Sequence, residues 1–197
     1  MVERRELVGG RTELPGLSRT PLLDTPEPAL NQAFAWAVRR DPSGVRADPG
    51  TEQVWSDVEL EDLLDSARSF RRVGPSTGLD PQLFLQQVVA GLFGVRADAA
   101  GGRFEIHPWR VDSWRAMALR RLRCHRTILD VEMRARSEWV TVRFEVGFGP
   151  AIPLSVQVRN TGPISQLTID EVPVEGERAV FTLQEQHEVT FFLRSSS

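Results

Sequence analysis

The chain has few of the residues that commonly carry covalent or membrane functions. It contains one cysteine, Cys124, so no disulfide can form within it. The N-terminal residues lack the apolar core of a secretion signal, and no run of 18 apolar residues follows. We therefore expect a cytoplasmic protein with no membrane partner.

Positive charge is also limited. The net charge is -3 and the pI is near 5.7, whereas nucleic-acid-binding proteins need a concentrated positive face. All 24 basic residues are arginine, and the one basic cluster spans 115–126. Acidic residues such as Asp130 and Glu132 stand where they could pair with it across strands. We expect an ion-paired sheet face there and no nucleic-acid partner.

No metal site or cofactor site is predicted. The three histidines, His107, His125 and His187, lie far apart in the sequence. Cys124 and His125 are adjacent, and adjacent strand residues point to opposite faces, so this pair is a poor chelate and a poor nucleophile–base pair. No glycine-rich phosphate loop follows a strand. We predict no catalytic residue.

The C-terminal half has the pattern of β-strands. Alternating apolar and polar residues are separated by turn signals such as Gly149–Pro150 and Glu175–Gly176–Glu177. Strands are expected near 103–107, 116–124, 127–135, 138–146, 152–159, 164–170, 178–183 and 187–194. Eight short strands in about 95 residues are typical of an antiparallel β-sandwich.

The N-terminal half has the pattern of helices. Apolar residues recur at helical spacing over 28–40, and Ser56 or Asp57 could begin a second helix that runs to about Arg72. Asp80 followed by Pro81 is a helix start for a third, strongly apolar helix that ends near Gly94. The predicted fold is α+β: an irregular arm (1–24), a segment of about three helices (25–100) and a β-sandwich (101–197) on which the helices pack.

The junction between the two halves carries a family resemblance. The stretch GLFGVRADAAGGRFEIHPW resembles the end of the last barrel helix and the start of the β domain in (α/α)6-barrel glycosidases of the glycogen-debranching (amylo-alpha-1,6-glucosidase) and glucoamylase-like kind. The matching residues are Gly91, Leu92, Gly94, Asp98, Gly102, Arg103 and Pro108. Trp114 and Leu119–Leu122 are similar to the segment that follows. A shorter stretch, 25–38, is similar to the segment that opens the catalytic domains of these enzymes.

This resemblance implies glycosidase chemistry, which the chain lacks the length to perform. Glycosidases place two carboxyl groups on either side of the scissile bond. Twelve barrel helices with their loops need roughly 190 residues, and only about 100 precede the predicted β domain. No acid or base of the family has a counterpart here. The acidic run Glu59–Asp65 is expected to be a solvated helix face, and Glu52 beside Trp55 is a weak sugar-site candidate.

The segment His107–Trp114 is the strongest local candidate for binding. Trp109 and Trp114 could stack on a sugar ring while Arg110 and Asp112 hydrogen-bond its hydroxyl groups. The alternative is that both indoles pack between the helices and the β domain. Buried rings would favour this second interpretation.

We therefore expect a non-catalytic structural or interaction module, related to the C-terminal region of a glycoside hydrolase. Two alternatives stay open. One is a carbohydrate-binding module that uses Trp109 and Trp114, with an oligosaccharide as its partner. The other is a subunit that completes a glycosidase with another chain, or a homo-oligomer, through the helix at 79–95.

Overall fold

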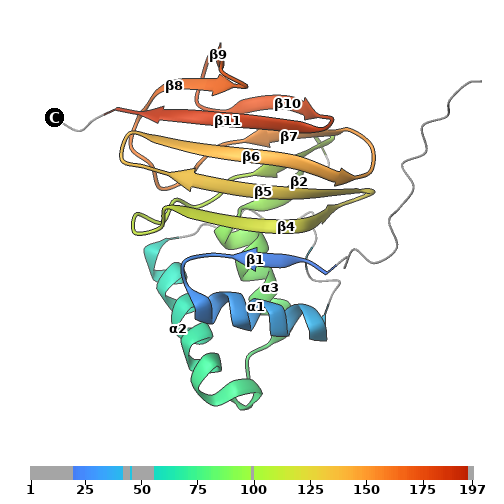
Figure 1. Cartoon of the computed structure of the whole chain (residues 1–197), viewed down its shortest axis with the longest axis vertical. Coiled ribbons are helices and arrows are strands. Elements are labelled where there is room, and N and C mark those ends of the chain that lie inside the picture. The colour runs from blue at the N-terminus through green and yellow to red at the C-terminus, as the bar shows by residue number, and fades with distance from the viewer. Residues whose placement is uncertain (1–19, 42–44, 46–55, 99, 195–197) are drawn as a thin grey trace, which may run out of the picture.

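A computed structural model describes residues 20–41, 45, 56–98 and 100–194. Within this part the chain is an α+β fold with three helices and two mostly antiparallel sheets (Figure 1). No helix among the described residues has the length and apolar character that crossing a membrane requires.

The helices begin where the sequence supplies caps. Helix α1 (Pro28–Arg40) begins after Glu27, whose carboxylate accepts a hydrogen bond from the Ala29 N–H at 3.3 Å. Helix α2 (Asp57–Val73) begins after Ser56, whose N–H donates to the Glu59 carboxylate at 2.9 Å. A short 3-10 helix, η2 (Gly74–Thr77), follows α2. Both α1 and α2 match the sequence prediction.

The third helix differs from the expected regular α-helix. Helix α3 (Pro81–Gln86) begins at Asp80 as predicted, and Asp80 accepts from the Leu83 N–H at 3.0 Å. It then widens into a π-helical segment, η3 (Gln87–Leu92), and the Phe93 N–H donates to the Val88 carbonyl at 3.0 Å. π-helical segments are rare and are frequent at functional sites.

The larger sheet has seven strands in the order β1-β4-β5-β6-β11-β8-β9. Its strands are β1 (Leu22–Asp24), β4 (Ala116–Cys124), β5 (Thr127–Ala135), β6 (Trp139–Phe148), β8 (Ile164–Ile169), β9 (Val172–Val174) and β11 (Gln186–Leu193). The predicted irregular arm therefore ends in a strand, because β1 pairs with β4 along Leu22–Asp24.

The smaller sheet has four strands in the order β10-β7-β3-β2. Its strands are β2 (Val95–Asp98), β3 (Arg103–Ile106), β7 (Ile152–Val156) and β10 (Ala179–Leu183). Strands β3 and β7 run parallel, which is the exception to the antiparallel prediction. Strands β2 and β3 form a hairpin, so the predicted boundary between 100 and 101 falls within one sheet.

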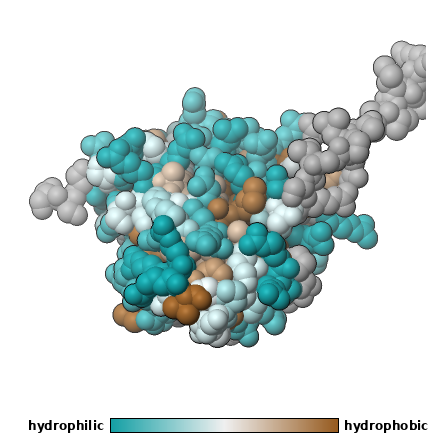
Figure 2. Space-filling view, turned by 60° about the horizontal axis from the view of Figure 1, so that its bottom comes forward, coloured by the Kyte–Doolittle hydropathy of each residue, from teal (hydrophilic) through white to brown (hydrophobic). Residues whose placement is uncertain are grey.

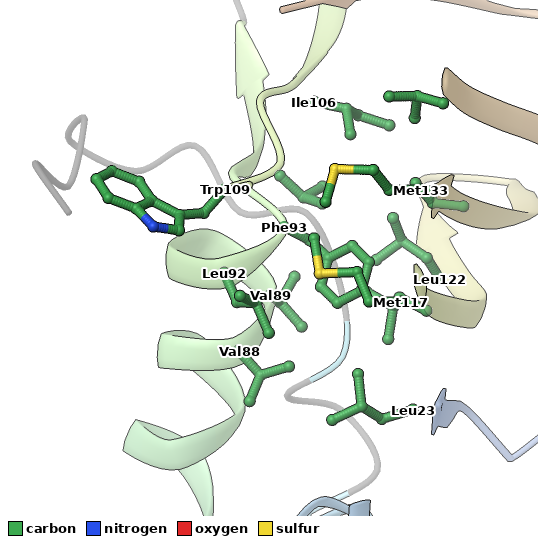
Figure 3. Close-up of a cluster of buried hydrophobic side chains, with 14 of the residues drawn as sticks. Leu23, Val88, Val89, Leu92, Phe93, Ile106, Trp109, Met117, Leu122 and Met133 are labelled. Carbon is green, nitrogen blue, oxygen red and sulfur yellow. The ribbon is translucent and has the colours of Figure 1, made fainter. Parts of the chain in front are cut away.

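One buried cluster joins the helices to both sheets. Figure 3 shows Val89 and Phe93 from the third helix beside Met117 of β4 and Met133 of β5. Phe144 of β6 and Phe181 of β10 link the two sheets, with ring centroids 5.9 Å apart. The expected packing of the third helix on the sheets is confirmed, since its apolar side fills this cluster.

Candidate functional site

The helix–sheet junction, residues 91–114, contains both the stretch that carries the family resemblance and the predicted sugar-binding residues. Gly94 ends the helical run with φ +59°, and a Cβ there would lie 2.2 Å from the His107 carbonyl oxygen. The returning chain caps the helix: the His107 N–H donates to the Gly94 carbonyl at 3.1 Å and the Trp109 N–H to the Leu92 carbonyl at 2.8 Å. Only glycine fits this approach without strain.

Arg159, which is distant in the sequence, donates hydrogen bonds to the junction. Its Nε donates to the His107 carbonyl at 2.6 Å, and its Nη2 donates to the Gly91 carbonyl. The guanidinium carbon lies 5.6 Å from the centroid of the Trp109 ring, which is a cation–π distance. One arginine therefore binds the π-helical segment, the end of β3 and the Trp109 indole.

The two predicted sugar-stacking rings are buried in this junction. Trp109 is 9% exposed and Trp114 is 8% exposed, and both belong to the shared core cluster. In Figure 3 the Trp109 indole points to the opposite side of the helix end from Phe93. Stacking needs an open ring face, so these buried rings agree with the packing interpretation and not with a sugar-binding platform.

The two polar residues of the predicted site lie beside the rings but do not complete a binding surface. Arg110 and Asp112 form an ion pair at 3.6 Å, in which the Asp112 side chain is 80% exposed. The Arg110 backbone is held on both sides, because its N–H donates to the Arg159 carbonyl and its carbonyl accepts from the Asn160 side chain.

A second polar cluster, which the sequence did not single out, lies on the outer face of the four-stranded sheet. Ile106 points into the core, so Glu105 points the other way. The Glu105 carboxylate is buried and pairs with Arg96 and, at 3.7 Å, with Arg178. Alternation along 103–107 placed Glu105 and His107 on one face, but the two arginines come from other strands.

Burial controls the protonation of His107 in this cluster. Desolvation lowers its pKa from 6.5 to about 4, against the opposing effect of the Glu105 charge. Its Nε2 and the Oγ of Ser155 on β7 are both buried without a hydrogen-bond partner among the described residues. These two atoms do not bond one another, so the cluster holds serine, histidine and glutamate without a proton-relay geometry.

Cys124 is not positioned for nucleophilic chemistry. Its thiol is fully buried, and desolvation raises its pKa to about 12. His125, in the turn after β4 with φ +54°, is exposed and stacks edge-on against Phe104 at 5.3 Å. Cys124 is thus buried at the end of β4, whereas His125 is exposed in the following turn and not on the strand that the sequence argument assumed. Across the residues with described positions, no group of three histidine, cysteine, aspartate or glutamate side chains could hold a metal ion.

Within the basic cluster, Arg120 forms the ion pairs that were predicted. Arg120 lies 3.4 Å from Asp130 and 3.6 Å from Glu132 across the β4–β5 pair. A bulge between Leu119 and Leu122 shifts the alternation, and Arg121 there adopts φ +59°. Arg120 thus pairs with opposite charges on the neighbouring strand.

The acidic run on α2 is a solvated helix face. Glu61, Asp62 and Asp65 are exposed, and Arg68 pairs with Asp65 at 3.1 Å and with Glu27, which caps the start of α1, at 3.4 Å. The other candidate pair, Glu52 and Trp55, lies outside the described residues.

No protein-family model matches this sequence, and no curated protein does. Three solved structures are similar in part. A GH127 β-L-arabinofuranosidase from Geobacillus stearothermophilus T6 has 10% identity and a TM-score of 0.39 over 57% of this chain and 18% of its own. An α-L-rhamnosidase from Streptomyces avermitilis has 13% identity and a TM-score of 0.36, over 56% of this chain and 11% of its own.

A GH30 endoxylanase from Clostridium papyrosolvens C71 has 6% identity and a TM-score of 0.28, over 83% of this chain and 46% of its own. The chain thus spans less than a fifth of the first two enzymes and less than half of the third. TM-scores this low establish neither a common fold nor a common activity.

Proposed function

We propose that the chain is a self-contained, non-catalytic structural module. In this proposal the two sheets, to which β1 and β2 also belong, form a sandwich, and the helices α1 to α3 close one end of it. The arrangement corresponds to the last barrel helix and β domain that the junction sequence resembles, without the remainder of a barrel.

The observation that carries the proposal is the internal burial of the third helix. Phe84, Leu85, Val88, Leu92 and Phe93 are each at most 1% exposed within this single chain. A helix from a missing barrel would present such side chains to absent neighbours. Here α1 and the sheets already cover them.

The chemically capable groups support a non-catalytic function. Glycoside hydrolysis needs one protonated and one ionised carboxyl facing each other across the substrate. The buried carboxylate, Glu105, is instead held between Arg96 and Arg178. His107 is neutral at physiological pH and the Cys124 thiol is protonated.

Association with a second copy or a glycosidase chain through the helix at 79–95 is supported by fewer observations than the self-contained module. Leu83 is the large apolar residue of that helix that remains exposed, at 56%, within the described part. Figure 2 shows the helical end of the molecule, where apolar groups are separated by hydrophilic ones. Stable interfaces generally need a contiguous apolar patch of several hundred Å2.

The proposal is tested by assaying the purified chain against aryl glycosides and soluble polysaccharides. We expect hydrolysis no faster than in buffer. A turnover that co-purifies with the chain and is abolished by Glu105→Gln would contradict the proposal. A trace activity that Glu105→Gln leaves intact would instead indicate a contaminating enzyme.

A further inference from the structure

The outer face of the seven-stranded sheet carries two aromatic rings at directly paired positions. Val140, Val142 and Phe144 of β6 point into the core, so Trp139 points outward. On β11, Phe191 is buried and Phe192 is 37% exposed. Trp139 and Phe192 are cross-strand partners in the β6–β11 register, so their side chains are neighbours on one face.

Hydrogen-bonding side chains surround the two rings. Gln166 of β8 is exposed and pairs with Phe192. In the next row, Thr141 and Thr190 are cross-strand partners with their hydroxyl oxygens 3.0 Å apart. Arg134 stands opposite Thr141 on β5. Every one of these groups can donate a hydrogen bond, and the hydroxyl and amide oxygens can also accept one.

Arg134, the arginine opposite Thr141, is ion-paired. Arg134 Nε lies 2.7 Å from the Glu132 carboxylate, and Arg120 shares that carboxylate and the one on Asp130. An anionic ligand would have to compete with these pairs. A bare apolar helix would bury the Gln166 amide without offering it a hydrogen-bond partner, which costs free energy.

The described helices leave this face uncovered. The described helices lie beyond β1 at one edge of the sheet, and none crosses the face formed by β5, β6 and β11 (Figure 1). The opposite side of this sheet is turned to the core and to the strands β10 and β7. Phe192 is exposed and Trp139 is half-buried on this face, so a ligand could reach both side chains from outside the sheet.

We propose that Trp139 and Phe192 form a stacking platform for a neutral oligosaccharide. A sugar ring offers an apolar C–H face for the two aromatic rings and hydroxyl groups at its edge for Gln166, Thr141, Thr190 and Arg134. The site is distinct from Trp109 and Trp114, which are buried. The site would supply a ligand for the proposed non-catalytic module. It does not depend on that proposed function, because sugar binding and sugar hydrolysis are measured in separate experiments.

The experiment is isothermal titration of the full chain with maltohexaose, cellohexaose and xylohexaose. We expect one of these probes to bind. Trp139→Ala and Phe192→Ala should each weaken that binding at least about tenfold, which corresponds to about 1.4 kcal/mol. Trp139→Phe keeps a stacking ring and should retain a part of the affinity.

Phe148→Ala is the matched control, since Phe148 is an aromatic residue that is 58% exposed at the far end of the same strand. It should bind as the unmodified chain does. Failure of all three probes to bind, or binding that Trp139→Ala leaves unchanged, would overturn the proposal. So would self-association that Trp139→Ala abolishes, because the rings would then serve a second copy of the chain.

Discussion

Gly94 is the residue at which the helical run turns into the first strand of the smaller sheet. It adopts φ +59° against the His107 carbonyl, whereas Gly78 adopts φ +72° with no atom within 4 Å of the position that a Cβ would take. The two glycines share a backbone conformation and differ in their surroundings. Comparing them separates backbone strain from steric exclusion.

Gly94→Ala should destabilise the protein by about 3 kcal/mol, because strain and a clash with the His107 carbonyl add. Gly78→Ala should cost about 1 kcal/mol from strain only. Urea unfolding of both variants measures the difference. Equal losses of stability would contradict the close approach at the junction.

His107 makes stability depend on pH. Its pKa in the folded state is about 4, below the 6.5 of an ordinary histidine. Below about pH 6.5 the unfolded chain binds a proton that the folded chain does not, so stability is complete above that pH and falls as the pH drops toward about 4.

Between about pH 7 and pH 4.5 the free energy of unfolding should therefore decrease by up to about 3 kcal/mol on account of His107. His107→Gln should remove that share of the slope, as measured by urea unfolding at several pH values. Asp170 has a lowered pKa, and desolvation partly opposes the hydrogen bonds from Glu188 and His187 that lower it. Its contribution is lost only at more acidic pH. An unchanged slope in His107→Gln would contradict the burial argument.

For single residues, the sequence indicated which aromatic side chains could bind a ligand more readily than it indicated their neighbours in the fold. It identified Trp109 and Trp114 and offered both a stacking and a packing interpretation, but it did not reveal the bridge to the distant Arg159 that places Trp109. For the same reason it missed Trp139 and Phe192, which become neighbours only through the β6–β11 register.

The elements were largely predictable where their signals are local. All eight predicted strands are present with ends within about three residues, because alternation and turn residues are local properties. The three missed strands, β1, β2 and β9, have three or four residues each. Strand β9 contains Pro173, which tolerates only an edge position, and β1 exists through pairing with β4.

The connection between the third helix and the sheets depends on Arg159. Arg159→Met should cost about 2–3 kcal/mol, because it leaves the Gly91 and His107 carbonyls without charged donors. Arg159→Lys should recover little, since an ammonium group cannot reproduce the planar fork. Thermal unfolding of these variants tests the connection.

Arg143→Met is the control for that test, because Arg143 is an exposed arginine that pairs with Gln186 and Glu145 on the sheet surface. Its loss should change stability by less than about 1 kcal/mol. If Arg159→Met were equally mild, the guanidinium would not be fastening the helix to the sheet.

At the scale of the whole molecule, the helices and both sheets share one buried cluster. Helix α1 should therefore open only when the sheets do. In native-state hydrogen exchange, the amides of Phe34 in α1 and Val131 in β5 should report the same free energy, equal to that of global unfolding. Exchange of Phe34 several kcal/mol more easily would indicate a helical unit that unfolds separately.

The central claim, a self-contained module, is tested most directly by the solution mass. Light scattering on a sizing column should give a monomer of 22.1 kDa over a wide range of concentrations, because the apolar face of the third helix is covered within the chain. A larger species that Leu83→Ser returns to the monomer would contradict the claim, since the helical end would then be binding helices from another chain.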